Sequence, residues 1–286
     1  MPERGSPILR HRRLGRGLRG LREGAGLTGD DVSRELSWSA AKVSRIENAK
    51  TLPTKRDVEV LLDLYGADRA ARQELLELRE HAAAKGWWER YRDALHPDLL
   101  TLMAMEAEAV EMRNWEPQVV PGLLQTEDYA RAFIETIQPI LQIPRQWVEA
   151  RVEARLLRQR TLLHGPDPVC LLAVFAESVL LRQYGSPAVM EAQLRHLIEV
   201  SELEHVEVRI LEQKVPAPIA AGPFLHLKFL DFPDLLYLED VFGARFAEDA
   251  ELVYSYERVF DNLKQYALDE ESSRQLIRGT LKHWQQ

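Results

Sequence analysis

Hydrogen-bond donors and small side chains gather on one short segment near the N-terminus. Its spacing turns Val43 and Ile46 inward and leaves polar and small residues outside. Basic side chains donate to phosphate oxygens and base edges, and small residues permit a close approach to them. Contact with nucleic acid is therefore the chemistry we consider first, with a solvated helix face as the alternative for any single basic residue. The outward residues are Ser39, Ala40, Lys42, Ser44 and Arg45, with Ala41 near the boundary.

A frame that could present these side chains is predicted over residues 14–66. Apolar residues recur there at helical spacing in four short stretches with tight connections. Thr28 and Thr54 each precede an Asp by three residues, which is the spacing of a capping box, and Ser39 can cap the third helix. A short helix held across another in this way fits the DNA major groove.

The segment GLTGDDVSRELSWSAAKVSRIENAKTLP, residues 26–53, resembles the helix-turn-helix of the Xre (Cro/CI-type) repressor family. Two positions depart from the family. Gly29 stands where the family usually has a Gln that braces against DNA, and Ser37 stands where it usually has Gly in the turn. The resemblance implies a lambda-repressor-like head and leaves the fold expectation intact. The likeness runs through Leu27, Val32, Leu36, Val43, Ser44, Arg45, Ile46, Glu47 and Pro53.

We accordingly predict a DNA-binding surface centred on a helix at residues 39–48. Base contacts would come from this helix, and backbone contacts from the residues that flank it. The predicted DNA-binding residues are Thr28, Gly29, Ser39, Ala40, Ala41, Lys42, Ser44, Arg45, Asn48 and Lys50.

Charge is unevenly spread over the 286 residues. The chain has a net charge of −8, but residues 1–60 hold thirteen Lys and Arg against eight Asp and Glu, which leaves −13 for the remainder. A basic N-terminal module on an acidic body fits a DNA-binding head joined to a body that does not bind DNA. Its affinity should then fall with salt, with a slope of about −0.9 per phosphate contacted.

Length and composition exclude several classes of protein. No apolar run approaches the roughly 18–20 residues that span a bilayer, and the N-terminus lacks the apolar centre of a signal peptide. A single cysteine, Cys170, excludes a disulfide framework and a cysteine zinc site. We expect a cytoplasmic protein, nucleoid-associated when bound to DNA, in which Cys170 is a core thiol.

Four segments are predicted along the chain: a disordered basic arm at 1–12, the helix-turn-helix domain at 13–67, a helical connector at 68–86 and a body at 87–286. The body mixes helix and strand, so we predict an α+β domain with a mixed sheet of about five strands, of which 169–176 is central. Helices are predicted at about 98–108, 126–138, 145–163, 187–203, 248–267 and 271–284. Strands are predicted at about 109–115, 169–176, 206–211, 224–230 and 235–240.

The body carries a second resemblance, for which PGLLQTEDYARA (121–132) is the longest match. It looks like the uncharacterised C-terminal domain found behind Xre-type heads in many actinobacterial regulators. The resemblance implies a developmental or antibiotic regulator, often encoded beside a very small partner protein, and some members are antitoxin-like. The other matching segments are GWWERY (86–91), WEPQVV (115–120), RLLRQ (155–159), AESVLLR (176–182), VMEAQLRHLIE (189–199) and FDNLKQYALDEESSRQLI (260–277).

Catalytic motifs are weak or missing. Gly15, Gly17 and Gly20 match the spacing of a dinucleotide fingerprint, but no apolar strand precedes them and they lie within an amphipathic helix. Walker, HExxH and GxSxG motifs are absent, and the scattered histidines lack ligand spacing. We expect no enzyme, no cofactor and no metal.

An arginine stripe is the remaining candidate site. Arg151, Arg155 and Arg158 share one face of the predicted helix 145–163. They could bind an anionic effector or the acidic patch of a partner, or pair with acids of the same domain.

The sequence therefore predicts a sequence-specific DNA-binding transcriptional regulator. Heads of this size usually act in pairs on DNA half-sites, so we expect a homodimer whose body modulates DNA binding. The alternative is an antitoxin-like protein that sequesters a small acidic or neighbour-encoded protein partner, with DNA binding as autoregulation.

Overall fold

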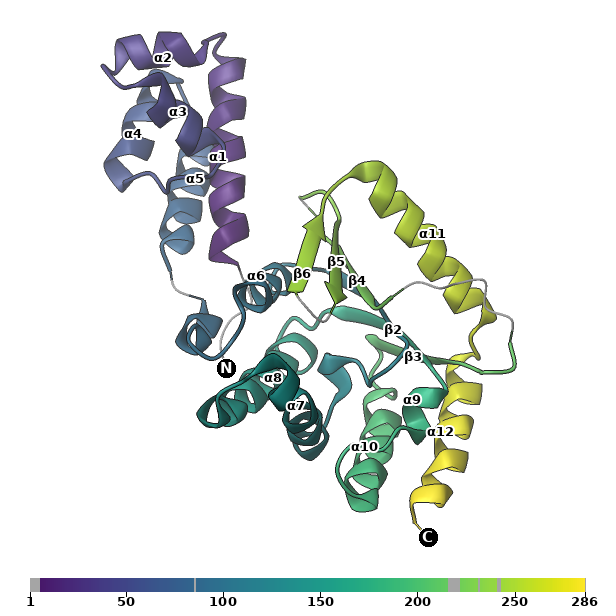
Figure 1. Ribbon diagram of the computed structural model, residues 1–286. Helices are drawn as coiled ribbons and strands as arrows, with labels where there is room; N and C mark the ends of the chain where they lie inside the picture. Colours follow the sequence, from purple (N-terminus) through teal and green to yellow (C-terminus); the bar gives the residue numbers. More distant parts are fainter. Residues whose placement is uncertain (1–5, 85, 216–221, 231, 241–242, 286) are drawn as a thin grey trace. The chain divides into compact units, whose positions relative to one another are not determined.

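Two compact units, divided between residues 89 and 90, make up the chain. The structure is a computed structural model that describes residues 6–84, 86–215, 222–230, 232–240 and 243–285. The N-terminal unit is helical and is called the head here, and the C-terminal unit, the body, combines helices with a mixed sheet (Figure 1). The predicted multidomain fold class is confirmed.

Five α-helices of the head form around one apolar core. The four predicted helices are confirmed, and the fifth packs Leu75 and Leu78 into the same core as Leu14 and Leu18. The expectation of a separate helical connector is therefore wrong, because the apolar side of this helix is buried within the head. The helices are α1 (Pro7–Gly24), α2 (Gly29–Glu35), α3 (Ala40–Glu47), α4 (Lys55–Leu64) and α5 (Arg69–Ala82).

Helix α1 begins earlier than predicted. The Ser6 hydroxyl accepts the amide of Leu9 at 3.2 Å, and Pro7 takes the first helical position, where its missing amide costs nothing. The predicted disordered arm at 1–12 is thus wrong for residues 6–12, whereas residues 1–5 lie outside the described residues.

The first four helices of the head all end in the same hydrogen-bonded turn. The second residue beyond each helix has a φ between 50° and 72°, and it and its successor donate to carbonyls three and five residues back at 2.8–3.4 Å. This pattern is the Schellman motif, which satisfies the last carbonyls of a helix. The left-handed residues are Gly26, Ser37, Ala49 and Gly66.

The body contains a six-stranded mixed sheet in the order β3-β2-β1-β4-β5-β6. Strands β1, β2 and β3 are parallel, and β4, β5 and β6 continue the sheet antiparallel. The strands are β1 (Glu111–Glu116), β2 (Cys170–Ala176), β3 (Val206–Leu211), β4 (Phe224–Lys228), β5 (Leu235–Asp240) and β6 (Gly243–Ala247). The prediction that 169–176 lies inside the sheet is confirmed, and β6 is a strand that the sequence did not predict.

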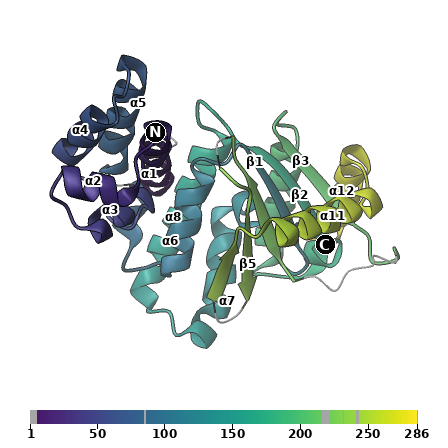
Figure 2. The ribbon, with the colours of Figure 1, turned by 90° about the horizontal axis from the view of Figure 1, so that it is seen from above.

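Helices cover both sides of this sheet. On one face α11 packs Phe260 and Leu263 against Trp115, Val174 and Phe224, and Figure 2 shows it crossing the strands. The helices α7, α8 and α10 lie on the other side (Figure 1). The helices of the body are α6 (Pro97–Glu106), α7 (Glu127–Leu141), α8 (Val148–Leu163), α9 (Ser178–Leu181), α10 (Pro187–Val200), α11 (Ala250–Tyr266) and α12 (Glu270–Trp284). Short 3₁₀ turns are η1 (Trp87–Tyr91), η2 (Gly122–Leu124) and η3 (Arg145–Trp147).

Candidate nucleic-acid interface

Helix α3 presents a small-residue surface at its amino end. Ser39 caps the helix by accepting the amide of Lys42 at 3.2 Å, and the structure leaves Ser39, Ala40 and Ala41 exposed. Val43 and Ile46 are buried in the head core, as the spacing predicted. Because nothing bulky covers the first turn, a base edge or a phosphate can come close to it.

Two contacts hold α3 against α1. A Cβ on Gly15 would lie 2.7 Å from the Glu47 carbonyl oxygen, so the two helices meet where only glycine fits. The Arg22 guanidinium also binds the Glu47 carboxylate through Nε at 2.7 Å and Nη2 at 3.0 Å. This hydrogen bond is the main reason why the pKa of Arg22 is raised. Of the glycines that resemble a dinucleotide fingerprint, Gly15 and Gly17 thus lie at close helix contacts, whereas no atom lies within 4 Å of a Cβ on Gly20.

Arg45 projects from the exposed side of α3. Glu47, the acid that the sequence places nearest to it, is taken by Arg22. Among the described residues, no group bonds the Arg45 guanidinium, which leaves all its donors available to a ligand.

Lys42 is engaged within the head. Its Nζ lies 2.6 Å from Asp57 Oδ1 and 3.6 Å from the centre of the Trp38 ring. Partial burial of Asp57 opposes its ionisation, but hydrogen bonds from Lys42 and Thr54 outweigh this and lower the pKa of Asp57. To contact a base, Lys42 would have to leave this carboxylate.

The remaining predicted DNA-binding residues surround α3. Thr28 is exposed and completes the predicted capping box with Asp31, whose Oδ2 accepts the Thr28 hydroxyl at 2.5 Å. Asn48 is exposed and donates to the Ser44 carbonyl at 2.8 Å. Exposed Ser44 and Lys50 and half-buried Gly29 complete the set.

Four positioning residues were not predicted from the sequence. Trp38, Asp57, Arg22 and Glu47 hold the α3 side chains without being exposed binding groups. The capping spacing marked Asp57, and Glu47 belonged to the family pattern, but no periodic signal marks an Arg22–Glu47 pair 25 residues apart.

The arginine stripe of the body separates into different environments. Arg158 binds the fully buried Glu106 carboxylate at 2.5 and 2.6 Å, which is the predicted alternative of pairing within the domain. Arg155 donates to the Gln125 amide oxygen, and the Arg151 Nε is buried without a partner. Burial raises the pKa of Glu106, and Arg158 opposes that shift.

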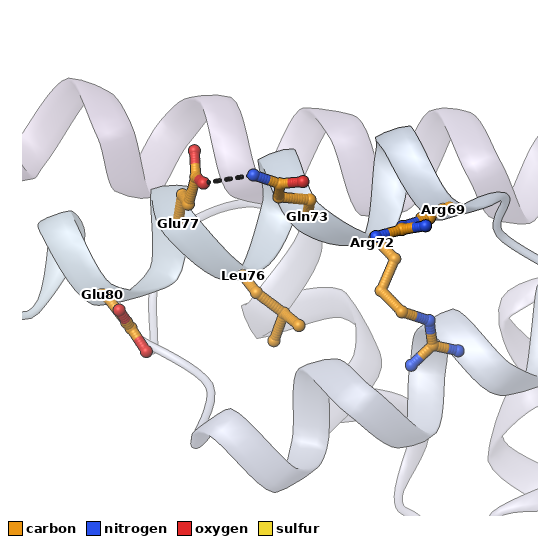
Figure 3. A pocket seen from close by; sticks show the side chains of 6 residues that line it. All are labelled: Arg69, Arg72, Gln73, Leu76, Glu77 and Glu80. Atoms are coloured by element: carbon orange, nitrogen blue, oxygen red, sulfur yellow. Dashed lines mark hydrogen bonds between the residues drawn. The ribbon is translucent and has the colours of Figure 1, made fainter.

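A cavity of about 330 Å³ lies beside α5 in the head (Figure 3). Of its charged lining, Arg72 binds Asp63 and Glu80 binds Lys55 at 3.1 Å, whereas no described residue binds Arg69. Gln73 and Glu77 hydrogen-bond to each other at 2.9 Å, as Figure 3 shows. The lining therefore offers a ligand only the Arg69 side chain and the partly buried Leu76 beyond groups that described residues already bind.

Comparison with protein families assigns both units. Residues 99–279, more than half of the chain, match the family described as a domain of unknown function (DUF5753). The chain belongs to the DUF5753 family. Residues 13–75, ahead of the DUF5753 domain, match a helix-turn-helix domain, which indicates DNA binding and transcription regulation. Neither curated proteins nor solved structures gave a match to this DUF5753 protein.

Metal ligands and membrane-spanning helices were sought in the described part of the DUF5753 chain. Within it, no group of three His, Cys, Asp or Glu side chains could hold a metal ion. No described helix is both long and apolar enough to cross a membrane.

Proposed function

We propose that this protein is a sequence-specific transcriptional regulator that reads DNA through α3. The observation that carries the proposal is the Arg45 guanidinium, which no described residue binds, on an exposed helix whose first turn is Ser39, Ala40 and Ala41. An arginine so placed can bind a guanine edge through two hydrogen bonds. The contacts of Gly15 and Arg22 with Glu47 keep the helix in register with the head, which favours a precise contact.

The proposal also covers the type of head, the oligomeric state and the roles of individual residues. The head is of the Xre type, and two copies bind half-sites one helical turn apart as a homodimer. Thr28, Asn48 and Lys50 contact the phosphate backbone, and Lys42 joins the base contacts when it exchanges Asp57 for DNA. The DUF5753 domain supplies regulation, through an effector or a small neighbour-encoded protein, and the regulator acts at the nucleoid in the cytoplasm of an actinobacterium.

Selection of genomic DNA fragments by the purified full-length protein tests this function. Arg45→Ala is the test variant, and Arg19→Ala is its matched control. Arg19 also lies in the head but is paired with Glu23 at 2.9 Å on α1. We expect the unchanged protein and Arg19→Ala to enrich the same few sites with a shared palindromic motif.

Arg45→Ala should weaken specific binding by about 1–3 kcal/mol and leave binding to random DNA nearly unchanged. An equal loss on both kinds of DNA would make Arg45 a phosphate contact. No loss, with circular dichroism showing intact helices, would remove α3 from the interface. Absence of any enriched site would favour the antitoxin-like alternative, in which partner capture is the main activity.

A further inference from the structure

Among the residues that the structure describes, three charged side chains of the DUF5753 domain have no charged partner at hydrogen-bond distance. The Arg155 guanidinium makes one hydrogen bond, to the neutral Gln125 amide. Arg151 makes none with a described residue, and its Nε is buried. In the described part of the chain, Glu116, the last residue of β1, also has no hydrogen-bond partner. Burying charged groups without such partners is costly, so their presence needs a reason.

The contact between Arg158 and Glu106 is an example of how Arg155 could bind a carboxylate. It binds the Glu106 carboxylate through Nε and Nη2, the side edge of the guanidinium fork. Arg155, one turn earlier on α8, uses Nη1 for Gln125 and keeps the equivalent edge free of described partners. This edge matches a carboxylate in shape and charge.

Hydrogen bonds from glutamine side chains hold the segment that lies beside Arg155. Gln159 donates to the carbonyls of Gly122 and Gln125 at 3.0 and 2.7 Å, and Gln193 donates to the Leu124 carbonyl at 2.7 Å. Gln125 itself donates to the Val120 carbonyl at 2.6 Å. The long PGLLQT match in the sequence is thus a hydrogen-bonded segment against α8, and it fixes one side of Arg155.

The other sides of Arg155 are also defined. The Phe133 ring centre lies 5.7 Å from its Cζ, and a Cβ on Gly122 would lie 3.9 Å from its Nε. Burial is the largest cause that lowers the pKa of Arg155 to about 10 and raises that of Glu116 to about 8. The carboxylates of Glu239 and Glu116 partly oppose the shift of Arg155, and the charge of Glu239 adds to the shift of Glu116. The raised pKa favours the protonated form of Glu116, which can donate a hydrogen bond.

We propose that Arg155 and Arg151 bind the carboxylate of a small organic acid and that Glu116 hydrogen-bonds to a hydroxyl or amino group of the same molecule. A hydroxy or amino carboxylate supplies both groups, and a compact anion reaches half-buried arginines more readily than a protein surface does. Only the role of this ligand as the effector of DNA binding rests on the proposed function. Ligand binding itself requires no DNA, so a failure of DNA binding would not contradict the ligand site.

Isothermal titration of the full-length protein at pH 7 tests the site. The carboxylate probes are L-malate and L-glutamate. Inorganic phosphate is titrated separately, as an anion of a different class. We expect saturable binding of at least one carboxylate, more tightly than phosphate. Arg155→Gln should weaken this binding at least tenfold, and Arg155→Lys should weaken it similarly, because lysine keeps the charge but loses the fork.

Arg160→Gln is the matched control, since it removes the same charge from an exposed position of α8. Its affinity should equal that of the unchanged protein. Tighter binding of phosphate, equal binding by a folded Arg155→Lys variant, or no saturable binding of either carboxylate would overturn the inference. A ligand that binds but leaves DNA affinity unchanged would keep the site and remove its regulatory role.

Discussion

Replacing Gly15 by alanine should loosen the contact between α1 and α3. The added Cβ would lie 2.7 Å from the Glu47 carbonyl oxygen and 2.9 Å from that of Ile46. Both atoms belong to the backbone, so no side-chain rotation relieves the overlap. Reaching an ordinary contact of about 3.5 Å requires a backbone shift of roughly 0.8 Å.

The size of the effect follows from two opposing contributions. Overpacking of this kind costs about 1–3 kcal/mol, and alanine in place of glycine within a helix returns about 1 kcal/mol. The net destabilisation is then about 0–2 kcal/mol. Gly20→Ala is the matched control because no atom lies within 4 Å of its added Cβ. It should stabilise by about 1 kcal/mol, so the two variants should differ by about 1–3 kcal/mol.

Hydrogen exchange of peptides from α1 and α3, measured on the full-length protein, gives the opening free energy of the head directly. DNA affinity should also fall in Gly15→Ala, because the displaced helix carries Arg45. Equal protection in the two alanine variants would refute the argument that the glycine contact positions α3.

Further predictions concern strain, a buried ion pair and pH. Ser37→Gly should stabilise the chain by about 0.5–1 kcal/mol, because Ser37 has a φ of 54°, and a destabilisation in urea unfolding would contradict this. Arg158→Ala should cost about 3–5 kcal/mol by leaving Glu106 buried and unpaired, whereas Arg158→Met with Glu106→Leu should cost far less; equal losses would refute the pairing. Burial raises the pKa of Glu116 from 4.5 to about 8, so the folded state keeps a proton that the unfolded state releases, and this stability is lost as pH rises between these values. Glu116→Gln should flatten that fall by at least about 1 kcal/mol in urea titrations across this range, and an unchanged pH profile would contradict it.

The head could be predicted well because its signals are local. Caps at Thr28, Ser39 and Thr54 and an apolar residue every three or four positions fix helices by neighbouring contacts. The errors arose where tertiary contacts decide. The basic residues after Pro7 look disordered by composition, and only the packing of Leu75 reveals α5 as a core helix.

Long-range pairing limited the prediction of the body. The predicted strands with β-branched or large apolar residues are present, but GARFA becomes β6 only by pairing with β5. The three arginines do lie on one helix at the predicted spacing. The helical period cannot show, however, that Arg158 binds Glu106, 52 residues away, or that Arg155 donates to a glutamine. The α3 surface was predicted by residue, but the engagement of Lys42 by Asp57 was not.

The repeated Schellman turns constrain how the head can vary in length. After α1, α2 and α4 the left-handed residue is followed by one residue and then directly by the next N-cap, at Thr28, Ser39 and Asp68. Every residue in these connections either takes part in the Schellman turn or caps the next helix. A single inserted residue would therefore break the cap or rotate the next helix by about 100°. The connection after α3 differs, since Thr51, Leu52 and Pro53 separate its turn from the cap at Thr54. Length changes among relatives of the head should therefore collect between α3 and α4, and the other three connections should keep one length.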